Sequence, residues 1–444
     1  MDLSNIFKAY DVRGLSPQQL DEPAAERIGA AFARFAGANR VAVGRDCRLS
    51  SPGLSAAVIR GITSQGVDAV DLGLITTDML YYAAGALDMP GIVITASHNP
   101  PEYNGLKFCR EGAAPVGADS GLGDIRAFAE TGLDPAAVLG SISELDVGTD
   151  YVSHVVGVVG ADAIGPLRVA ADGGNGMAGV ALPAVFDRLA ASLDALYLEP
   201  DGTFPNHPAD PLQPENLRDL LDLVERTSPD LGVAFDGDAD RAFFVDEHGV
   251  PLSGSTTTAI VAEWFLERHP GATVVHNLIC SRAVPEIVTR AGGTPVRTRV
   301  GHSFIKEIMK DTGAVFGGEH SGHYYFRDNF HADSGILAML VLLRVLSERQ
   351  VPLSELRVTY EPYAQSGEIN LRVSSPHDVL ESVAAAYPEV DRLDGLTVDL
   401  GAGTWFNLRP SNTEPVLRLN VEAHDADEVS KTVAAVRASV EAAS

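Results

Sequence analysis

The segment TASHNP at residues 95–100 places a hydroxyl, an imidazole and an amide directly after the apolar run 91–94. That run predicts a short buried strand, and Pro100 ends regular structure. Ligands of open α/β sheets bind beyond the carboxyl ends of strands, so Ser97 is a candidate reactive hydroxyl. The alternative is an ordinary polar turn, because Ser, Asn and Pro are common turn residues.

An acidic motif, DGDADR, lies between two apolar runs that predict strands at 231–235 and 242–245. Three carboxylates alternate along this turn and can converge on one divalent cation: Asp236, Asp238 and Asp240. The spacing resembles the start of an EF-hand, but Arg241 stands where that loop needs Gly, so we reject an EF-hand. An acidic turn neutralised by Arg241 is the alternative, although three uncompensated carboxylates would repel one another. A Mg²⁺ ion would relieve the repulsion and polarise a phosphoryl oxygen.

A second polar cluster, GEHSGH at residues 318–323, follows a short apolar run. Glu319 and Ser321 supply acceptors and a donor of the kind that hold neighbouring hydroxyls of a sugar. The histidines of this cluster, with His331, could imitate a zinc site, but their spacing matches no familiar one. Plain loop residues are the other interpretation.

A third motif, RPSNTEP at residues 409–415, lies between two predicted strands and is followed by Arg418. A guanidinium beside hydroxyl, amide and backbone N–H groups makes a good phosphate cradle. The alternative is an ordinary loop, in which Ser, Asn and Thr between prolines have no binding role.

Three other residues are candidates on weaker grounds. Arg13, in the segment KAYDVRG at 8–14, could pair with a phosphate. Lys107 could share the loop of Ser97, and a solvated surface lysine is the alternative. His302 begins a predicted helix and could carry a proton or contact a ligand, whereas a structural histidine is at least as common.

The composition limits the possible partners. The chain has 444 residues, of which 45% are hydrophobic and 21% charged, and these values describe a globular protein of several domains. Its formal net charge of −27 argues against nucleic acid, so a phosphorylated ligand would need a local cluster of Arg, Lys and backbone N–H groups. No stretch reaches the roughly 18 apolar residues of a membrane span. Three widely spaced cysteines and the lack of a signal-peptide pattern predict a cytoplasmic protein.

Helical and strand-like segments alternate over residues 21–360, which favours parallel sheets covered by helices. Among them we expect a helix with Ser51 as its N-cap and another helix near 181–193. After residue 360 strands follow strands, which predicts an antiparallel α+β module. Loop-like joints divide the chain into four expected domains, at residues 1–147, 148–250, 251–361 and 362–444.

Taken together and in this order, the motifs TASHNP, DGDADR, GEHSG and RPSNTEP make the chain resemble the α-D-phosphohexomutases, the superfamily of phosphomannomutases and phosphoglucomutases. The resemblance spans essentially the whole chain. It implies an α/β protein with four domains around a central cleft, three similar α/β/α-layered domains and a C-terminal α+β TATA-binding-protein-like domain. The chain departs from the family at His320, where bacterial relatives often have Met or Gln, and near 277–282, where a lysine of some members is not identifiable.

The resemblance also implies a role for each motif. Ser97 would be the phosphorylated serine and would bind Mg²⁺ together with the three aspartates of the acidic loop. Lys107, Arg241 and His302 fall where the family places catalytic groups. The substrate would contact Tyr10, Arg13, Glu319, Ser321, Arg409, Ser411, Asn412, Thr413 and Arg418.

The implied activity interconverts hexose 1-phosphate and hexose 6-phosphate through a phosphoserine enzyme and a bound hexose 1,6-bisphosphate, which also acts as activator. Mannose is the expected sugar, with glucose as a second one, because Asn412 stands where the glucosamine branch usually has Gly. The alternatives are a phosphoglucosamine mutase, a Mg²⁺-dependent sugar phosphatase and a non-catalytic sugar-phosphate binding protein. We expect small hexose phosphates as ligands, neither nucleic acid nor membrane as partner, and a monomer or dimer.

Overall fold

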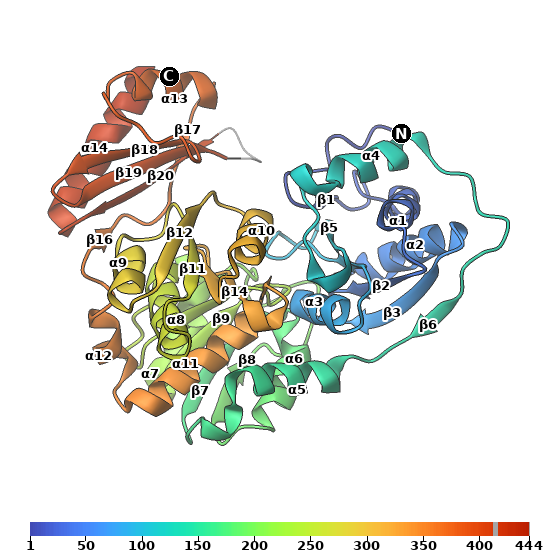
Figure 1. Cartoon of the computed structure of the whole chain (residues 1–444), viewed down its shortest axis with the longest axis horizontal. Coiled ribbons are helices and arrows are strands. Elements are labelled where there is room, and N and C mark those ends of the chain that lie inside the picture. Colours follow the sequence, from blue (N-terminus) through green and yellow to red (C-terminus); the bar gives the residue numbers. More distant parts are fainter. Residues whose placement is uncertain (412–415, 444) are drawn as a thin grey trace.

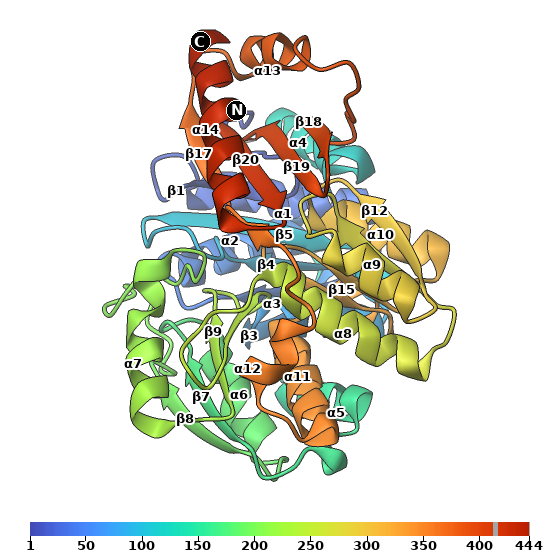
Figure 2. The same cartoon turned by 90° about the vertical axis from the view of Figure 1, so that its left-hand side faces the viewer.

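The computed structural model describes residues 1–411 and 416–443, with the side chain of His302 left aside. These residues fold into four units that follow one another along the chain, each with its own β-sheet (Figure 1). In the view of Figure 2 the C-terminal unit stands at the top of the molecule. The expectation of a four-domain α/β protein is confirmed.

The first unit contains, in chain order, β1 (Val12–Leu15), α1 (Glu22–Ala36), β2 (Arg40–Arg45), α2 (Ser51–Ser64), β3 (Asp68–Leu74), α3 (Thr77–Ala86), β4 (Gly91–Ile94), β5 (Tyr103–Cys109), α4 (Leu122–Thr131) and β6 (Ile142–Glu144). Its sheet has the order β1-β5-β4-β2-β3-β6. Alternate residues of a strand point to opposite faces. Accordingly, Ile92 and Ile94 of β4 share a core with α1, α2 and α4, whereas Val93 shares one with α3. Helices therefore cover both faces of the strand that leads to Ser97.

The second unit contains α5 (Gly148–Val159), β7 (Arg168–Asp172), α6 (Ala178–Phe186), β8 (Ser192–Leu196), α7 (Arg218–Thr227), β9 (Leu231–Phe235) and β10 (Ala242–Val245). Its sheet has the order β10-β9-β7-β8. The acidic motif is the tight connection between the antiparallel strands β9 and β10.

The third unit contains α8 (Gly254–Arg268), β11 (Thr273–Asn277), α9 (Ala283–Arg290), β12 (Thr294–Thr298), α10 (His302–Thr312), β13 (Phe316–Gly318), β14 (Tyr324–Phe326), β15 (Ala332–Asp333), α11 (Gly335–Arg349) and α12 (Leu353–Val358). Its sheet has the order β12-β11-β13-β14-β15. The GEHSGH cluster joins β13 to β14, which pair in antiparallel fashion.

The fourth unit contains β16 (Ala364–Gln365), β17 (Ile369–Arg372), α13 (Pro376–Ala384), β18 (Leu396–Gly401), β19 (Thr404–Pro410), β20 (Val416–Ala423) and α14 (Ala426–Ala443). All its strand pairs are antiparallel, with the order β16-β20-β19-β18 and β17 also paired to β20. The antiparallel α+β module expected from the sequence is confirmed. Short 3₁₀ turns lie elsewhere in the chain, at Glu111–Ala113, Ala118–Ser120, Ala161–Ala163, Pro214–Leu217 and Arg327–Asn329.

The structure corrects three local predictions. Ser50, not Ser51, is the N-cap of α2, because the Ser51 hydroxyl donates instead to Asp46 at 2.5 Å. The helix expected near 181–193 ends at Phe186, and β8 follows because its residues pair with β7, so tertiary pairing outweighs local helical pattern. The first three sheets are mixed rather than wholly parallel, since each has antiparallel pairs at one side.

The cores of the units differ in how far they extend. One continuous apolar cluster runs through the first three units and includes Leu80, Val155 and Leu340. The fourth unit has a core of its own, which includes Phe406 and Leu417. No helix in the described part of the chain is both long and apolar enough to cross a membrane.

Candidate active site

Ser97 lies three residues beyond β4 and is only 3% exposed. Its backbone is left-handed, with φ of 51°, a conformation that is strained for a residue with a side chain. The Ser97 hydroxyl donates to Asp236 Oδ2 at 2.7 Å, and Arg241 Nη2 donates to Ser97 Oγ at 3.3 Å. The acidic loop approaches so closely that a Cβ on Gly237 would lie 2.3 Å from the Ser97 carbonyl oxygen. A glycine at position 237 therefore allows this contact.

Arg48 holds the Ser97 loop in this shape and is fully buried. Its guanidinium donates at 2.6–3.0 Å to four carbonyl oxygens of the loop, those of Ser97, Asn99, Pro100 and Tyr103. It also pairs with Asp46 at 3.1 Å. The sequence analysis missed Arg48, yet a signal existed: Arg48 follows β2, which neighbours β4 in parallel, so both segments leave the same edge of the sheet.

The acidic loop brings three buried carboxylates together, those of Asp236, Asp238 and Asp240. Each offers an oxygen within 4.8 Å of an oxygen of the other two. Among the described residues, Oδ1 of Asp238 and Oδ1 of Asp240 are buried without a hydrogen-bond partner. Burial of unpaired anionic oxygens is unfavourable, so the loop suits an additional cation. Clustered carboxylate oxygens are the ligands that Mg²⁺ prefers.

Two buried cations neutralise part of this negative charge. Lys107 Nζ, from β5, lies 2.6 Å from Asp238 Oδ2 and 2.5 Å from Asp240 Oδ2. Arg241 Nε donates to Asp236 Oδ2 at 2.9 Å. Burial raises the pKa of Asp236 to about 6 despite this neighbour. Burial also acts on Asp238, but the Lys107 ammonium outweighs it and holds the pKa of that carboxyl below its usual range. Lys107 is thus a buried strand residue and not a solvated surface lysine.

A second buried network, which the sequence analysis did not foresee, adjoins the acidic loop. Lys306 Nζ lies 2.7 Å from Asp333 Oδ1, and His323 Nδ1 lies 2.8 Å from Asp333 Oδ2. His323 Nδ1 is also 3.9 Å from Asp240 Oδ1. Within the described residues, potential metal ligands come together in two groups: the three aspartates of the acidic loop, and Asp240 with His323 and Asp333. Neither group contains His320 or His331, the other two histidines of the zinc interpretation.

Glu319 forms part of the cleft wall in the third unit and is buried. Its carboxylate accepts hydrogen bonds from the Tyr325 hydroxyl at 2.5 Å, the Asn277 amide at 2.9 Å and the Gly301 N–H at 3.3 Å. These donors fix the carboxylate in one orientation. Ser321 lines the same cleft.

Tyr10 and Arg13 lie on the other side of the cleft, in the first unit. The Tyr10 hydroxyl donates to the Val300 carbonyl oxygen at 3.0 Å and so joins the first unit to the third. Burial raises the pKa of Tyr10 to about 12. Arg13 pairs with Asp11 at 2.8 Å and donates to Asn99 Oδ1 at 2.5 Å. Arg13 therefore braces the Ser97 loop while it faces the cleft.

Arg409 and Arg418 are direct neighbours on β19 and β20, and both line the cleft. A single carboxylate, that of Glu368, lies 2.8 Å from Arg409 Nη2 and 3.3 Å from Arg418 Nη1. Ser411 lines the cleft beside them. The remaining predicted site residues, or their side chains, lie outside the described part of the chain: Asn412, Thr413 and the side chain of His302.

One cleft of about 1180 Å³ brings these groups together from all four units. It is lined by Ser97 and Lys107 from the first unit, Arg241 from the second, Glu319 from the third and Arg409 from the fourth. Basic side chains outnumber acidic ones along its wall, although the whole molecule has a net charge of −27. This is the local cationic cluster that a phosphorylated ligand requires.

Four family models match successive parts of the chain. They are described as phosphoglucomutase/phosphomannomutase alpha/beta/alpha domain I, II and III and C-terminal domain, and they match residues 4–131, 149–249, 253–363 and 368–439. A phosphomannomutase of Salmonella typhimurium is 41% identical over 431 residues, which are 94% of each chain. A phosphomannomutase of Escherichia coli K12 is 39% identical over 431 residues, again 94% of each chain.

Solved structures agree with these sequence matches. The crystal structure of a phosphoglucomutase/phosphomannomutase family protein from Burkholderia thailandensis has a TM-score of 0.90 and 33% identity, and the match covers 100% of this chain and 98% of that one. A putative phosphomannomutase from Thermus thermophilus shares the fold, with a TM-score of 0.85 and 24% identity over 99% of both chains. The chain therefore belongs to the phosphoglucomutase/phosphomannomutase family and is an α-D-phosphohexomutase.

Proposed function

We propose that this phosphohexomutase interconverts mannose 1-phosphate and mannose 6-phosphate, accepts glucose phosphates as second substrates, and works through phosphorylated Ser97 and a bound hexose 1,6-bisphosphate. The relatives at about 40% identity over most of the chain are phosphomannomutases, which supports mannose over glucosamine. The family match also disfavours a phosphatase and a non-catalytic binding protein.

The contact between Ser97 and the acidic loop carries the proposal. The Ser97 hydroxyl is 2.7 Å from Asp236 and lies beside Arg241. A phosphoryl group on Ser97 would add nearly two negative charges next to three carboxylates that, among the described residues, Lys107 and Arg241 contact directly. A divalent cation is therefore needed for charge balance, and the unpaired oxygens of Asp238 and Asp240 provide places for it.

We assign Mg²⁺ to Asp236, Asp238, Asp240 and the Ser97 phosphoryl group. When bound, it supplies charge stabilisation to the phosphoryl oxygens during transfer. Arg241 and Lys107 would stabilise the same oxygens, since both groups are held in place by carboxylates.

In the first transfer, the Oγ–P bond of Ser97 breaks and an O–P bond forms to the free hydroxyl of the sugar phosphate. The hydroxyl proton passes to His302, our proposed proton carrier, and the departing Ser97 oxygen takes up a proton from the Lys107 ammonium, which lines the same cleft. Glu319 and Ser321 hold sugar hydroxyls, and Arg409, Ser411, Asn412, Thr413 and Arg418 hold the non-reacting phosphate, with Tyr10 and Arg13 on the facing wall. The bisphosphate then turns within the cleft and returns its other phosphoryl group to Ser97, so one donor and one cradle serve both orientations.

We further propose domain boundaries after residues 147, 250 and 361, which fall in or near the gaps between the four matched segments. The proposed setting is the cytoplasm and the proposed state a monomer or dimer. The scattered thiols are compatible with a reducing compartment, since two of the three are buried.

One assay tests the function. The protein is incubated with Mg²⁺, a trace of hexose 1,6-bisphosphate and, separately, mannose, glucose or glucosamine 1-phosphate, and products are followed by ³¹P NMR. We expect 6-phosphate from mannose and glucose, and little from glucosamine. The control Ser153→Ala, which changes an exposed serine on α5, should behave as wild type. Release of inorganic phosphate without any 6-phosphate would contradict the proposal.

A further inference from the structure

Glu368 occupies the place where the substrate phosphate is expected. It stands just before β17 and lines the cleft. Its carboxylate reaches two arginines of the fourth unit, Arg409 at 2.8 Å and Arg418 at 3.3 Å. These arginines face each other across β19 and β20, so one small anion can contact both. The fold thus supplies an anion of its own to the cradle.

The arginines also have donors to spare. The Nε atoms of Arg409 and Arg418 are both buried without a hydrogen-bond partner in the described residues. A guanidinium has five N–H donors, and a carboxylate can accept from only some of them in one geometry. Unused buried donors beside an open cleft indicate a larger anion, such as a phosphate with three free oxygens.

We infer that Glu368 is an internal counter-ion of the phosphate cradle, which competes with the substrate phosphate for Arg409 and Arg418 and so weakens phosphate binding. The inference rests on the proposed function, because it takes these arginines as the phosphate site. A tethered carboxylate is always present at high local concentration, so an incoming phosphate must displace it or bind beside it. In either case the negative charge at position 368 lowers phosphate affinity.

Weaker phosphate binding by the cradle would suit the proposed reaction. The bisphosphate has to release one phosphate from the cradle, turn, and dock the other phosphate before the second transfer. An overly tight cradle would retain the first phosphate and slow that exchange. Glu368 would keep the two guanidinium groups paired with an anion during the exchange, without a lasting hold on the ligand.

A merely structural role for Glu368 predicts the opposite effect. If the carboxylate served only to orient the arginines, its removal would leave their guanidinium groups without a fixed orientation and would weaken phosphate binding. The side chain of Glu368 is 30% exposed and is not part of the apolar core, so the substitution Glu368→Gln is compatible with folding. The sign of the change in affinity therefore separates the two roles.

The experiment measures inorganic phosphate and mannose 1-phosphate binding to the full chain by calorimetry, for wild type, Glu368→Gln and Glu368→Asp. For Glu368→Gln we expect the Kd for inorganic phosphate to fall roughly fivefold, as suits loss of one partly exposed charge. The KM of this variant for mannose 1-phosphate should also fall, and so should its kcat. Glu368→Asp keeps the charge and should stay near wild type in Kd.

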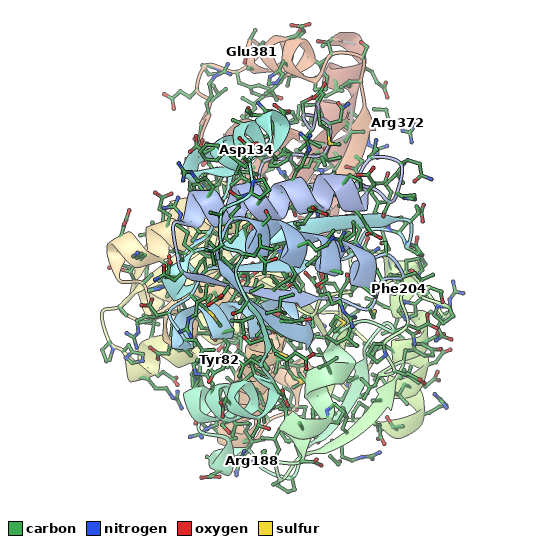
Figure 3. All side chains as sticks on the ribbon, turned by 90° about the vertical axis from the view of Figure 1, so that its right-hand side faces the viewer. Tyr82, Asp134, Arg188, Phe204, Arg372 and Glu381 are labelled. Atoms are coloured by element: carbon green, nitrogen blue, oxygen red, sulfur yellow. The ribbon has the colours of Figure 1, made fainter. Side chains whose placement is uncertain are left out.

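Glu381→Gln is the matched control. Glu381 belongs to the same unit and pairs with Arg392 at 2.6 Å, but it lies on α13 at the outer edge of the molecule (Figure 3). This control should leave Kd, KM and kcat unchanged. An equal tightening in the control would show a general charge effect and would overturn the inference.

An unchanged or raised Kd in Glu368→Gln would also overturn it. The variant Arg409→Gln distinguishes this failure from failure of the proposed function. If Arg409→Gln weakens phosphate binding while Glu368→Gln does not tighten it, the cradle is correct and only the role of Glu368 is wrong. If Arg409→Gln leaves phosphate binding intact, the cradle itself is misassigned and both proposals fall.

Discussion

The junction of the first three units and the junction between the third and fourth units are built in different ways. In the first junction the apolar core is continuous, and buried polar groups tie the units together. The Thr77 hydroxyl donates to Asp238 at 2.6 Å, which links α3 to the acidic loop. Hydroxyls of Tyr151 and Ser334, from the second and third units, both donate to the buried Asp78 of the first, at 2.5 and 2.6 Å.

In the second junction the ion pairs lie near the surface. Arg297 pairs with Asp391, and Arg282 pairs with Asp399 at 2.7 Å, with all four side chains at least 31% exposed. The core of the fourth unit does not merge with that of the other three. Exposed ion pairs contribute little to stability and are screened by salt.

The difference separates two tasks. Ser97 and the proposed metal ligands lie at the buried junction, where strain and unpaired charges are held by surrounding structure. The proposed phosphate cradle lies on the fourth unit, which has a core of its own and is joined to the third by exposed ion pairs. We therefore expect phosphoryl transfer to depend on the first junction, and substrate entry and exclusion of water to depend on the second.

The largest effect should come from Asp238→Asn, which alters the centre of the buried junction. We expect kcat to fall at least about 100-fold, because a proposed metal ligand and the partner of Lys107 are lost together. Mn²⁺ binding followed by electron paramagnetic resonance should weaken in parallel. Asp222→Asn, on the exposed face of α7, is the control. Unaltered Mn²⁺ binding in Asp238→Asn would refute the metal assignment.

Arg48→Met should damage stability more than any change at the outer junction. The substitution leaves Asp46 buried without its cation and four loop carbonyls without their donor, so we expect a loss of about 3–5 kcal/mol in the free energy of unfolding. Urea denaturation measures it. Arg60→Met breaks the exposed ion pairs between Arg60 of α2 and Glu22 and Glu26 of α1, and should lower the free energy of unfolding by less than about 1 kcal/mol. Equal losses in both variants would remove the contrast between buried and exposed charge.

Asp78→Asn tests the buried junction through pH. Burial raises the pKa of Asp78 from its usual 3.8 to about 6, despite three hydroxyl donors. The folded state therefore binds more protons between these values, and stability falls as pH rises through about 4 to 6. Asp78→Asn should remove this part of the slope, about 3 kcal/mol. Denaturation midpoints at several pH values check it, with exposed Asp88→Asn as control. A slope identical to wild type would contradict the assignment.

Asp391→Asn should have the smallest effect. It removes one exposed pair between the third and fourth units, so we expect less than about 1 kcal/mol of lost stability and at most a few-fold rise in KM. Added KCl should imitate it in the wild type because salt screens the same contact. A loss of several kcal/mol would mean that the outer junction is as firmly built as the inner one.

The sequence predicted elements and motifs wherever local pattern decides the outcome. β9 and β10 have the expected bounds, because an apolar run ends there at clear turn residues. Arg48, Asp333 and Glu368 escaped prediction for a common reason. Each acts on a partner that folding brings close, such as Ser97 for Arg48 and Arg409 for Glu368. Sequence spacing does not identify such pairs, and for Arg48 the one signal is its place directly after a strand.

The most direct test of the account is transfer of phosphate to Ser97. The enzyme is mixed with hexose 1,6-bisphosphate labelled with ³²P, quenched on the millisecond timescale and digested for peptide mapping. We predict that Ser97 gains the label and then passes it to mannose 6-phosphate, both at least as fast as overall turnover. The variant Ser97→Ala should gain no label, and its activity should fall roughly 1000-fold or more. Label on another residue, or turnover with unlabelled Ser97, would contradict the account.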